Sequence, residues 1–305
     1  MAFKRTEFYQ VESTDTLSAT PEEGEAWRIT KIEVSGGSEG DTIEVKIGKT
    51  SVFYAPLVFG GRPLFSFSGS DPTYPNLFDF LKSVGKNLVF PVAAGETVTI
   101  TTSSTVTAIR ITYEVFDAGD VSPEEPNGSK ATEYTLFSWI ANGSAVTDSG
   151  WINLNSNKCP AEYPDFPAQA VPSKTTAEIH MVAARPIAAS VGDGSSSLGT
   201  SYSKYLRLIY RRAVLFDPNR NGWNVLGNSS YSETSTTMSY DYSSSLNDLP
   251  VLPVAEGKAM VFEDPLTIPE GEELSVQVYV EHTSGVDIPA GEVQALFLVT
   301  FKPVR

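Results

Sequence analysis

The chain has 305 residues, which exceeds the size at which a single hydrophobic core usually stops growing, about 250 residues, so two domains are expected. Its formal net charge of −15 and sequence pI near 4.6 exclude the dense basic surface that direct binding to nucleic acid requires. No stretch reaches the roughly 18 apolar residues of a membrane-spanning helix, and the first residues lack the apolar core of a secretion signal. We therefore expect a chain without a membrane span that is synthesised in a cytoplasm.

The first third of the sequence predicts antiparallel strands. Apolar and polar residues alternate in WRITKIEV and TAIRITYEV, which is the period of a strand with one buried face. The Gly-rich residues between positions 35 and 41 predict that the first two strands pair directly as a hairpin. The predicted strands are Trp27–Val34, Thr42–Ile47, Val52–Tyr54, Asn87–Phe90, Thr97–Thr101 and Val106–Phe116. The one good helix candidate is Pro75–Val84, because a proline opens it and Gly85 follows its end.

Residues 117–130 combine Asp, Glu, Pro, Gly and Ser without an apolar stripe, which is typical of an exposed linker. Beyond it the sequence predicts further strands at Thr132–Ile140, Gly150–Leu154, Thr176–Ala184, Tyr205–Phe216, Ala259–Phe262, Leu274–Glu281 and Val293–Pro303. Two Ser- and Tyr-rich stretches, 190–203 and 228–249, are predicted as surface loops. The sequence thus predicts an all-β protein of two tandem antiparallel β-sandwich domains that are jelly-roll-like, at residues 1–118 and 132–305, joined by a linker at 119–131.

A recurring turn precedes several of these strands. A proline or alanine is followed by Gly-Glu at positions 24–25, 95–96, 271–272 and 291–292, and a strand begins a few residues later. Proline fixes the first turn position, and glycine adopts a backbone angle that other residues avoid. These positions are therefore expected to be tight turns.

The two consecutive sandwiches, the Gly-Glu turns before late strands, the uncharged Ser/Tyr loops and the scarcity of Cys and His together resemble viral jelly-roll coat proteins. The resemblance is to the double jelly-roll major capsid proteins of icosahedral viruses, and also to capsid decoration or turret proteins. It implies a virion structural protein that self-assembles with other copies and other capsid proteins to form or decorate an icosahedral capsid. It also implies a location in the virion.

Catalytic motifs are not found in the sequence. The two histidines, His180 and His282, belong to neither a nucleophile elbow nor an HExxH helix, and no phosphate-binding loop is present. Cys159 is the only cysteine, so no disulfide forms within the chain. A pair of carboxylates brought together from distant strands, as in a glycosidase, stays open as a hypothesis. We expect no enzymatic activity and no cofactor.

One segment has the opening of a calcium loop. Asp217, Asn219 and Asn221 place oxygen side chains at alternate positions before Gly222. Only Asp217 carries a charge, and Asn228 stands where the twelfth-position acid of such a loop is expected. The alternatives are a calcium site and an ordinary Asp/Asn/Gly turn, and the composition favours the turn.

A group of arginines and tyrosines is the candidate for a contact with other subunits. In KYLRLIYRR the basic residues interleave with apolar ones as in a strand, and tyrosine and arginine are frequent in subunit contacts. The predicted interface residues are Arg207, Arg211, Arg212, Tyr231, Tyr240 and Tyr242. Aromatic rings also stack on sugars, and the aromatic residues available for this are Trp139, Trp151, Trp223, Tyr202, Tyr205, Tyr231, Tyr240 and Tyr242. The alternative function is therefore a carbohydrate- or receptor-binding β-sandwich module of a viral tail, a fibre or a cell surface, with glycans as partners.

Overall fold

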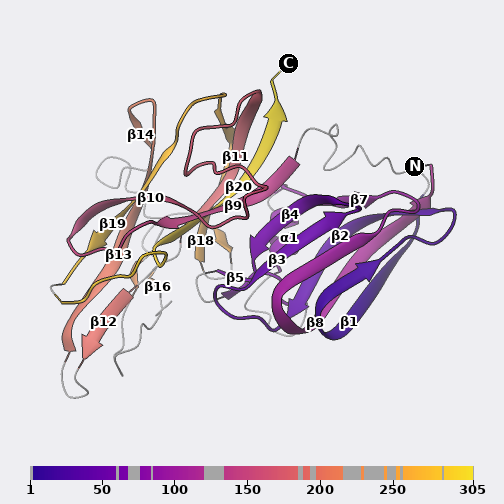
Figure 1. Ribbon diagram of the computed structural model, residues 1–305, viewed down its shortest axis with the longest axis horizontal. Helices are drawn as coiled ribbons and strands as arrows, with labels where there is room; N and C mark the ends of the chain where they lie inside the picture. The colour runs from indigo at the N-terminus through magenta and orange to yellow at the C-terminus, as the bar shows by residue number, and fades with distance from the viewer. Residues whose placement is uncertain are drawn as a thin grey trace. The chain divides into compact units, whose positions relative to one another are not determined.

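The computed structural model describes residues 3–59, 62–67, 76–83, 85–119, 134–184, 188–192, 197–215, 228–229, 244–245, 252–254, 257–283 and 285–304 (Figure 1). These residues are nearly all β, with one short helix, and the sheets are antiparallel. The chain divides into two compact units, Met1–Phe137 with Thr300–Pro303 and Ser138–Val299 with Val304–Arg305. The predicted all-β class with two β-sandwich domains is confirmed. No helix in the described part is long and apolar enough to cross a membrane.

The predicted linker at 119–131 lies, apart from Gly119, outside the described residues. The domain limits 1–118 and 132–305 therefore stay a prediction.

The first unit is built on one sheet. Its strands follow the order β4-β3-β8-β2-β7, and β1 pairs with β8; a small second pair is β5 with β6. The elements are β1 (Phe3–Ala19), β2 (Glu25–Ser35), β3 (Thr42–Ile47), β4 (Thr50–Pro56), β5 (Val58–Phe59), β6 (Arg62–Pro63), α1 (Leu77–Ser83), β7 (Phe90–Val92) and β8 (Val98–Asp117). The predicted helix is confirmed as α1, and the two predicted strands at 97–101 and 106–116 are one long strand, β8.

Strand β8 holds this unit together. Along one edge it pairs with β1 from Ala19↔Val98 to Phe3↔Phe116. Its other edge is divided, since residues 98–102 pair with β3 and residues 108–117 pair with β2. The predicted direct pairing of β2 with β3 is therefore wrong: the Gly-rich connection leads each of them to a different half of β8.

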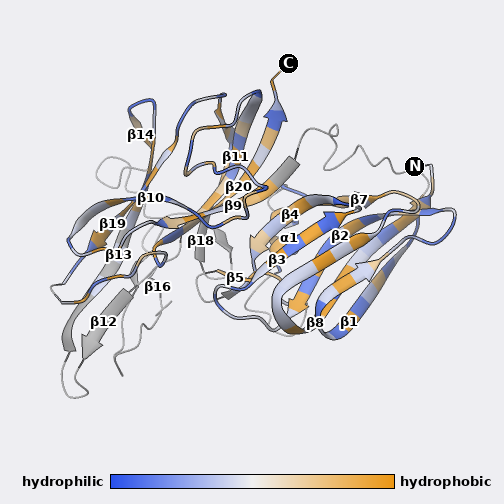
Figure 2. Cartoon of the chain, viewed as in Figure 1, coloured by the Kyte–Doolittle hydropathy of each residue, from blue (hydrophilic) through white to orange (hydrophobic). Residues whose placement is uncertain are grey.

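The core of the first unit follows from alternation along these strands, which is visible as alternating hydropathy in Figure 2. In β8 the residues Ile109, Ile111 and Val115 are fully buried, while the polar residues between them are only half-buried. A second part of this core is aromatic: one central ring contacts four others, with ring centroids 5.5–6.2 Å apart. The central ring is Phe53, and its neighbours are Phe65, Phe78, Phe90 and Phe137.

Helix α1 joins that aromatic cluster through its buried face, which consists of Leu77, Phe78, Phe80 and Leu81. Asn76 lies directly before it, and its Oδ1 accepts a hydrogen bond of 2.9 Å from the Phe78 amide. The Asn76 Nδ2 donates to the carbonyls of Ile32 and Ser66. One buried side chain thus caps the helix and fixes it to β2.

The second unit contains a ten-stranded sheet in the order β12-β13-β19-β10-β9-β20-β11-β18-β17, with β14 paired to β13. The strands are β9 (Tyr134–Asn142), β10 (Gly150–Asn157), β11 (Thr175–Ala184), β12 (Ala188–Gly192), β13 (Ser197–Tyr210), β14 (Ala213–Leu215), β15 (Asn228–Ser229), β16 (Ser244–Ser245), β17 (Leu252–Val254), β18 (Gly257–Ile268), β19 (Ser275–Glu281) and β20 (Gln294–Pro303). Strand β10 changes partner midway, because residues 150–153 pair with β19 and residues 154–157 with β9.

The prediction of a surface loop at 190–203 is wrong for most of these residues. Residues 190–192 belong to β12 and residues 197–203 to β13, and these two strands pair. Small polar residues gave no alternating pattern there, yet Ser201 and Ser203 are buried, and Ser201 donates a 2.6 Å hydrogen bond to the Val286 carbonyl. In the second predicted loop, only 228–229 and 244–245 are described, and they pair as β15 and β16.

The predicted Gly-Glu turns are confirmed by the backbone. Gly24, Gly95, Gly271 and Gly291 all have φ between 71° and 86°, the left-handed region that favours glycine. In three of these turns the glutamate amide donates to a carbonyl three residues back, for example the amide of residue 96 to the carbonyl of residue 93 at 3.0 Å. These are the tight turns that the recurring pattern predicts.

Replacing Ile111 by alanine is expected to lower the free energy of unfolding by about 2–5 kcal/mol, because its fully buried side chain would leave a cavity between the sheet and the core. Thr101→Ala on the exposed face of the same strand should cost less than about 1 kcal/mol. Urea denaturation followed by circular dichroism measures both. Equal losses for the two variants would contradict the assigned core face of β8.

Tyr113 gives a pH-dependent prediction. Its hydroxyl donates a 3.2 Å hydrogen bond to Glu7 Oε2, and burial, together with the Glu7 charge, raises its pKa to about 12. An unfolded tyrosine ionises near pH 10, so the stabilisation is complete below about pH 10 and is lost as pH rises toward about 12. Between these limits the wild type should lose stability relative to Tyr113→Phe, measured by urea denaturation at several pH values from about 9 to about 11.5. A constant difference between the two proteins would refute the raised pKa.

Candidate interaction face

Three neighbouring strands of the second unit present a patch of aromatic and polar side chains. In the register of the sheet, Tyr279 of β19 lies between Trp151 of β10 and Tyr205 of β13. One pair further along, Gln277 lies between Asn153 and Arg207. We call these six residues the aromatic face: Trp151, Asn153, Tyr205, Arg207, Gln277 and Tyr279.

The aromatic face is the outer side of strands whose inner side is core. Its members alternate in the sequence with Val276, Val278, Leu206 and Leu208, all at most 1% exposed. Because side chains alternate across a strand, the residues of the aromatic face point the opposite way. They are half-buried, except for Asn153, which is exposed.

The side chains of the aromatic face hold one another in place. The Arg207 guanidinium lies 3.9 Å from the centroid of the Trp151 ring. Arg207 Nε donates to Gln277 Oε1 at 2.7 Å, and Gln277 Nε2 donates to Asn153 Oδ1 at 2.7 Å. The Tyr279 ring centroid is 5.5 Å from Trp151 and 6.3 Å from Tyr205. The patch is therefore ordered before any partner binds.

A polar groove of about 700 Å³ adjoins the aromatic face and shares Asn153 with it. Arg211 and Arg212 line this groove from the turn between β13 and β14, where both have positive φ. Arg211 Nη2 donates to Glu272 Oε1 at 2.8 Å, and this bond lowers the pKa of Glu272. The groove beside the aromatic face is thus lined by the exposed ion pair of Arg211 and Glu272.

The predicted interface residues fall into two groups. Arg207 lies in the aromatic face, and Arg211 and Arg212 line the adjoining groove. The remaining candidates lie outside the described residues, namely the interface tyrosines Tyr231, Tyr240 and Tyr242 and the calcium candidates Asp217, Asn219 and Asn221. The interface role and the calcium site both stay predictions.

Sequence reasoning missed Asn153, Gln277 and Tyr279. The signal was present, because LSVQVYVE alternates, and every residue between its valines belongs to the outer side. The sequence does not show that β10, β19 and β13 are adjacent in the sheet. These strands are separated by up to about 120 residues along the chain.

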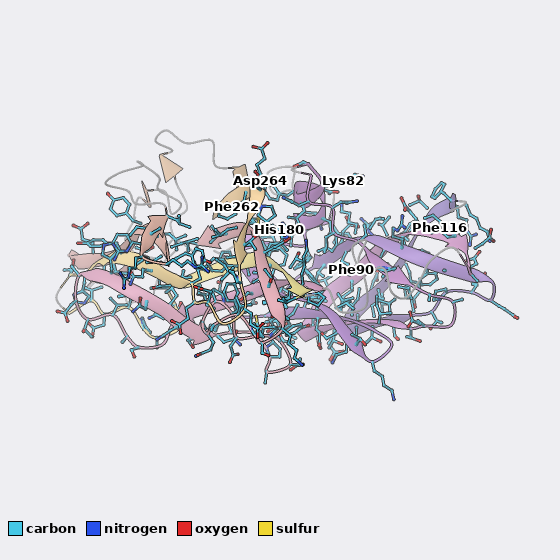
Figure 3. All side chains as sticks on the ribbon, turned by 90° about the horizontal axis from the view of Figure 1, so that it is seen from above. Lys82, Phe90, Phe116, His180, Phe262 and Asp264 are labelled. Carbon is cyan, nitrogen blue, oxygen red and sulfur yellow. The ribbon has the colours of Figure 1, made fainter. Side chains whose placement is uncertain are left out.

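Other chemistry-bearing side chains do not assemble in the described part of the chain. No three His, Cys, Asp or Glu side chains there lie close enough to hold a metal ion. His180, labelled in Figure 3, is half-buried in β11. His282 Nε2 lies 2.9 Å from Asp287 Oδ1, directly after β19.

No protein-family model matches the sequence, and no curated protein matches it. Among solved structures, the chain is similar to the crystal structure of the major capsid protein P2 from bacteriophage PM2, with a TM-score of 0.33 and 8% sequence identity. The alignment covers 96% of this chain and 98% of that chain.

Cys159 is expected to be unreactive in the folded chain. Burial raises the pKa of its thiol to about 12, so almost no thiolate exists near neutral pH. Its reaction with a thiol reagent such as dithiobis-nitrobenzoate should be at least about tenfold slower in the native protein than in concentrated guanidinium chloride. A cysteine introduced at the exposed position Thr147, in a Cys159→Ser background, should react rapidly in the native protein. Equal native rates for the two cysteines would contradict the prediction.

Proposed function

We propose that this chain is a structural protein of a virus particle, which self-assembles with neighbouring copies and other coat proteins to form or decorate an icosahedral capsid. The observation that carries the proposal is the aromatic face. Two all-β units in one chain are also what the resemblance to double jelly-roll coat proteins implies.

The composition of the aromatic face suits a protein–protein contact. Trp, Tyr and Arg are enriched at the centres of subunit interfaces, where a few such residues supply most of the binding energy. Each aromatic ring has only two side-chain torsions, and Arg207 is already held by Trp151 and Gln277. Little side-chain entropy is therefore lost when a second subunit covers the patch.

The groove beside the aromatic face fits the rim of such a contact. Arg211 and Glu272 are exposed charges that line it, with 57% and 36% of their side chains accessible. Exposed ion pairs contribute little to stability, but charges at a rim steer a partner and fix its orientation. In this proposal the aromatic face supplies affinity and the groove supplies specificity, and the chain has no enzymatic role.

Glycan binding is the second candidate, because the same patch combines rings with the amides of Asn153 and Gln277, which suit sugar hydroxyls. Against it, the Arg207 guanidinium lies over the Trp151 ring and occupies a face on which a pyranose would stack. The amides are also engaged with each other at 2.7 Å. A protein partner that packs on top of this network needs to displace neither contact.

The proposal is tested on Trp151→Ala/Arg207→Ala, with Thr147→Ala as a control at an exposed position outside the patch. The wild type should form rings, sheets or shells in electron microscopy and show concentration-dependent mass in sedimentation. The double variant should raise the concentration needed for assembly at least about tenfold, and the control should not. The same proteins are applied to a glycan array.

A wild type that stays monomeric at all concentrations and salt conditions would refute self-assembly. Glycan retention that is lost in the double variant, together with a monomeric wild type, would establish the second candidate instead. Assembly that the double variant leaves unchanged would show that the aromatic face is not the contact.

A further inference from the structure

Strand β1 is an edge strand of unusual length. It has 17 residues and pairs with β8 along almost all of them. Within the described residues no strand pairs with its other edge. The backbone amides and carbonyls on that side form a row of hydrogen-bonding groups that no described strand uses, and such a row is a template for another strand.

The middle of the open edge of β1 is regular and free of proline. From Arg5 to Glu12 the register with β8 is continuous, with irregularities only outside this run. The strand contains no proline, and no bulge interrupts its edge in that run.

The exposed apolar residues gather on this strand. Among the described residues, the large hydrophobic side chains that are exposed are Phe3, Phe8, Tyr9 and Val304, so three of the four belong to β1. Phe8 is 68% exposed, the highest of them. Exposed aromatic side chains beside an open strand edge mark a contact surface.

The sequence of this edge is complementary to itself. On the outer side of the strand stand, in order, Thr6, Phe8, Gln10 and Glu12, and the exposed Lys4 precedes them at the register shift between Phe3 and Arg5. When two copies run antiparallel about a two-fold axis at Phe8, Lys4 lies opposite Glu12 of the other copy. Thr6 then lies opposite Gln10, and the two Phe8 side chains face each other. Opposite charges and aromatic pairs at directly opposed positions are the pairs that stabilise antiparallel sheets.

We infer that β1 binds β1 of a second copy of this chain in that register, so that the sheets of two first units join into one. This inference rests on the proposed self-assembly and names one of its contacts. The two-fold axis makes the contact closed, since each edge is used once. The aromatic face then remains available for a different neighbour, and two separate contacts per chain are what an extended shell needs.

Existing contacts of β1 are compatible with this pairing. Arg5 is bound to Glu7 and Glu25 at 2.6 and 2.8 Å on the other side of the strand, so this cluster stays within each copy. Lys4 Nζ lies 2.6 Å from Asp117 Oδ1, an exposed pair that contributes little and leaves Lys4 able to reach a second carboxylate.

Charge reversal tests the register. Glu12→Lys places lysine opposite lysine, and Lys4→Glu places glutamate opposite glutamate, so each variant alone should dimerise through β1 at least about tenfold more weakly. Mixed together they restore both opposite pairs and should form a heterodimer, and the double variant Lys4→Glu/Glu12→Lys should regain wild-type affinity. Glu23→Lys, an equal charge change in an exposed turn, is the control. Sedimentation equilibrium of the full chain measures all of them.

Cross-linking tests the position of the axis. In a Cys159→Ser background, Phe8→Cys should form an inter-chain disulfide under mild oxidation, because directly opposite Cα atoms lie about 4.5–5.5 Å apart. Gln10→Cys should not, since its counterpart would be roughly 13 Å away along the strand. Circular dichroism confirms that each variant is folded.

Absence of a disulfide in the Phe8→Cys variant, or equal dimerisation by the mixed and the single charge variants, overturns the β1 contact. If assembly persists in that case and still depends on Trp151 and Arg207, the proposed function stands without it. If the wild type forms no assembly and the Phe8→Cys variant forms no disulfide, both proposals are wrong.

Discussion

Strand β8 uses both of its edges over 20 residues, and the first unit depends on this double pairing. One edge is taken by β1, and the other is shared by β3 and β2. A slip of β8 by one residue against its neighbours would turn Ile109, Ile111 and Val115 toward solvent, because successive side chains alternate between faces.

The same alternation produces both the core and the surface of the second unit. In β19 the valines pack inward, and this fixes Gln277 and Tyr279 on the outside. Strands β10 and β13 bring the other members of the aromatic face to them. Because the inner residues are packed in the core, the strand backbone is held in place, and the outer side chains therefore start from fixed positions. A preformed patch of this kind needs no separate loop to build it.

Where the sequence alternates strongly, the fold could be predicted from it. The strands around Trp27–Val34 and Leu274–Glu281, the helix after Pro75 and the glycine turns were all recognisable, because each depends on local chemistry. Strand β1 was missed, since its edge position leaves both of its faces largely exposed and so removes the alternation of apolar and polar residues. The serine-rich start of β13 was not predicted as a strand for a related reason. Its buried residue Ser201 is polar, and its hydroxyl donates a hydrogen bond to the backbone, so no apolar residue marks the buried face.

The candidate site was predictable only in part. Arg207 was singled out from its interleaving with apolar residues, but its partners Trp151 and Gln277 come from strands far away in the sequence. The pairing order that unites them depends on the change of partner within β10, between residues 153 and 154. No local pattern signals such a change.

The glycine turns have a further consequence. At Gly24, Gly95 and Gly271 an added Cβ atom would meet nothing within 4 Å, so these turns project into open space. Each is closed by a backbone hydrogen bond of its own, while the strands on either side are fixed by pairing elsewhere. Insertions at exposed turns of this kind leave the flanking strands in register. They are the places where this chain can acquire new segments, and with them new external features, while the two units stay as they are.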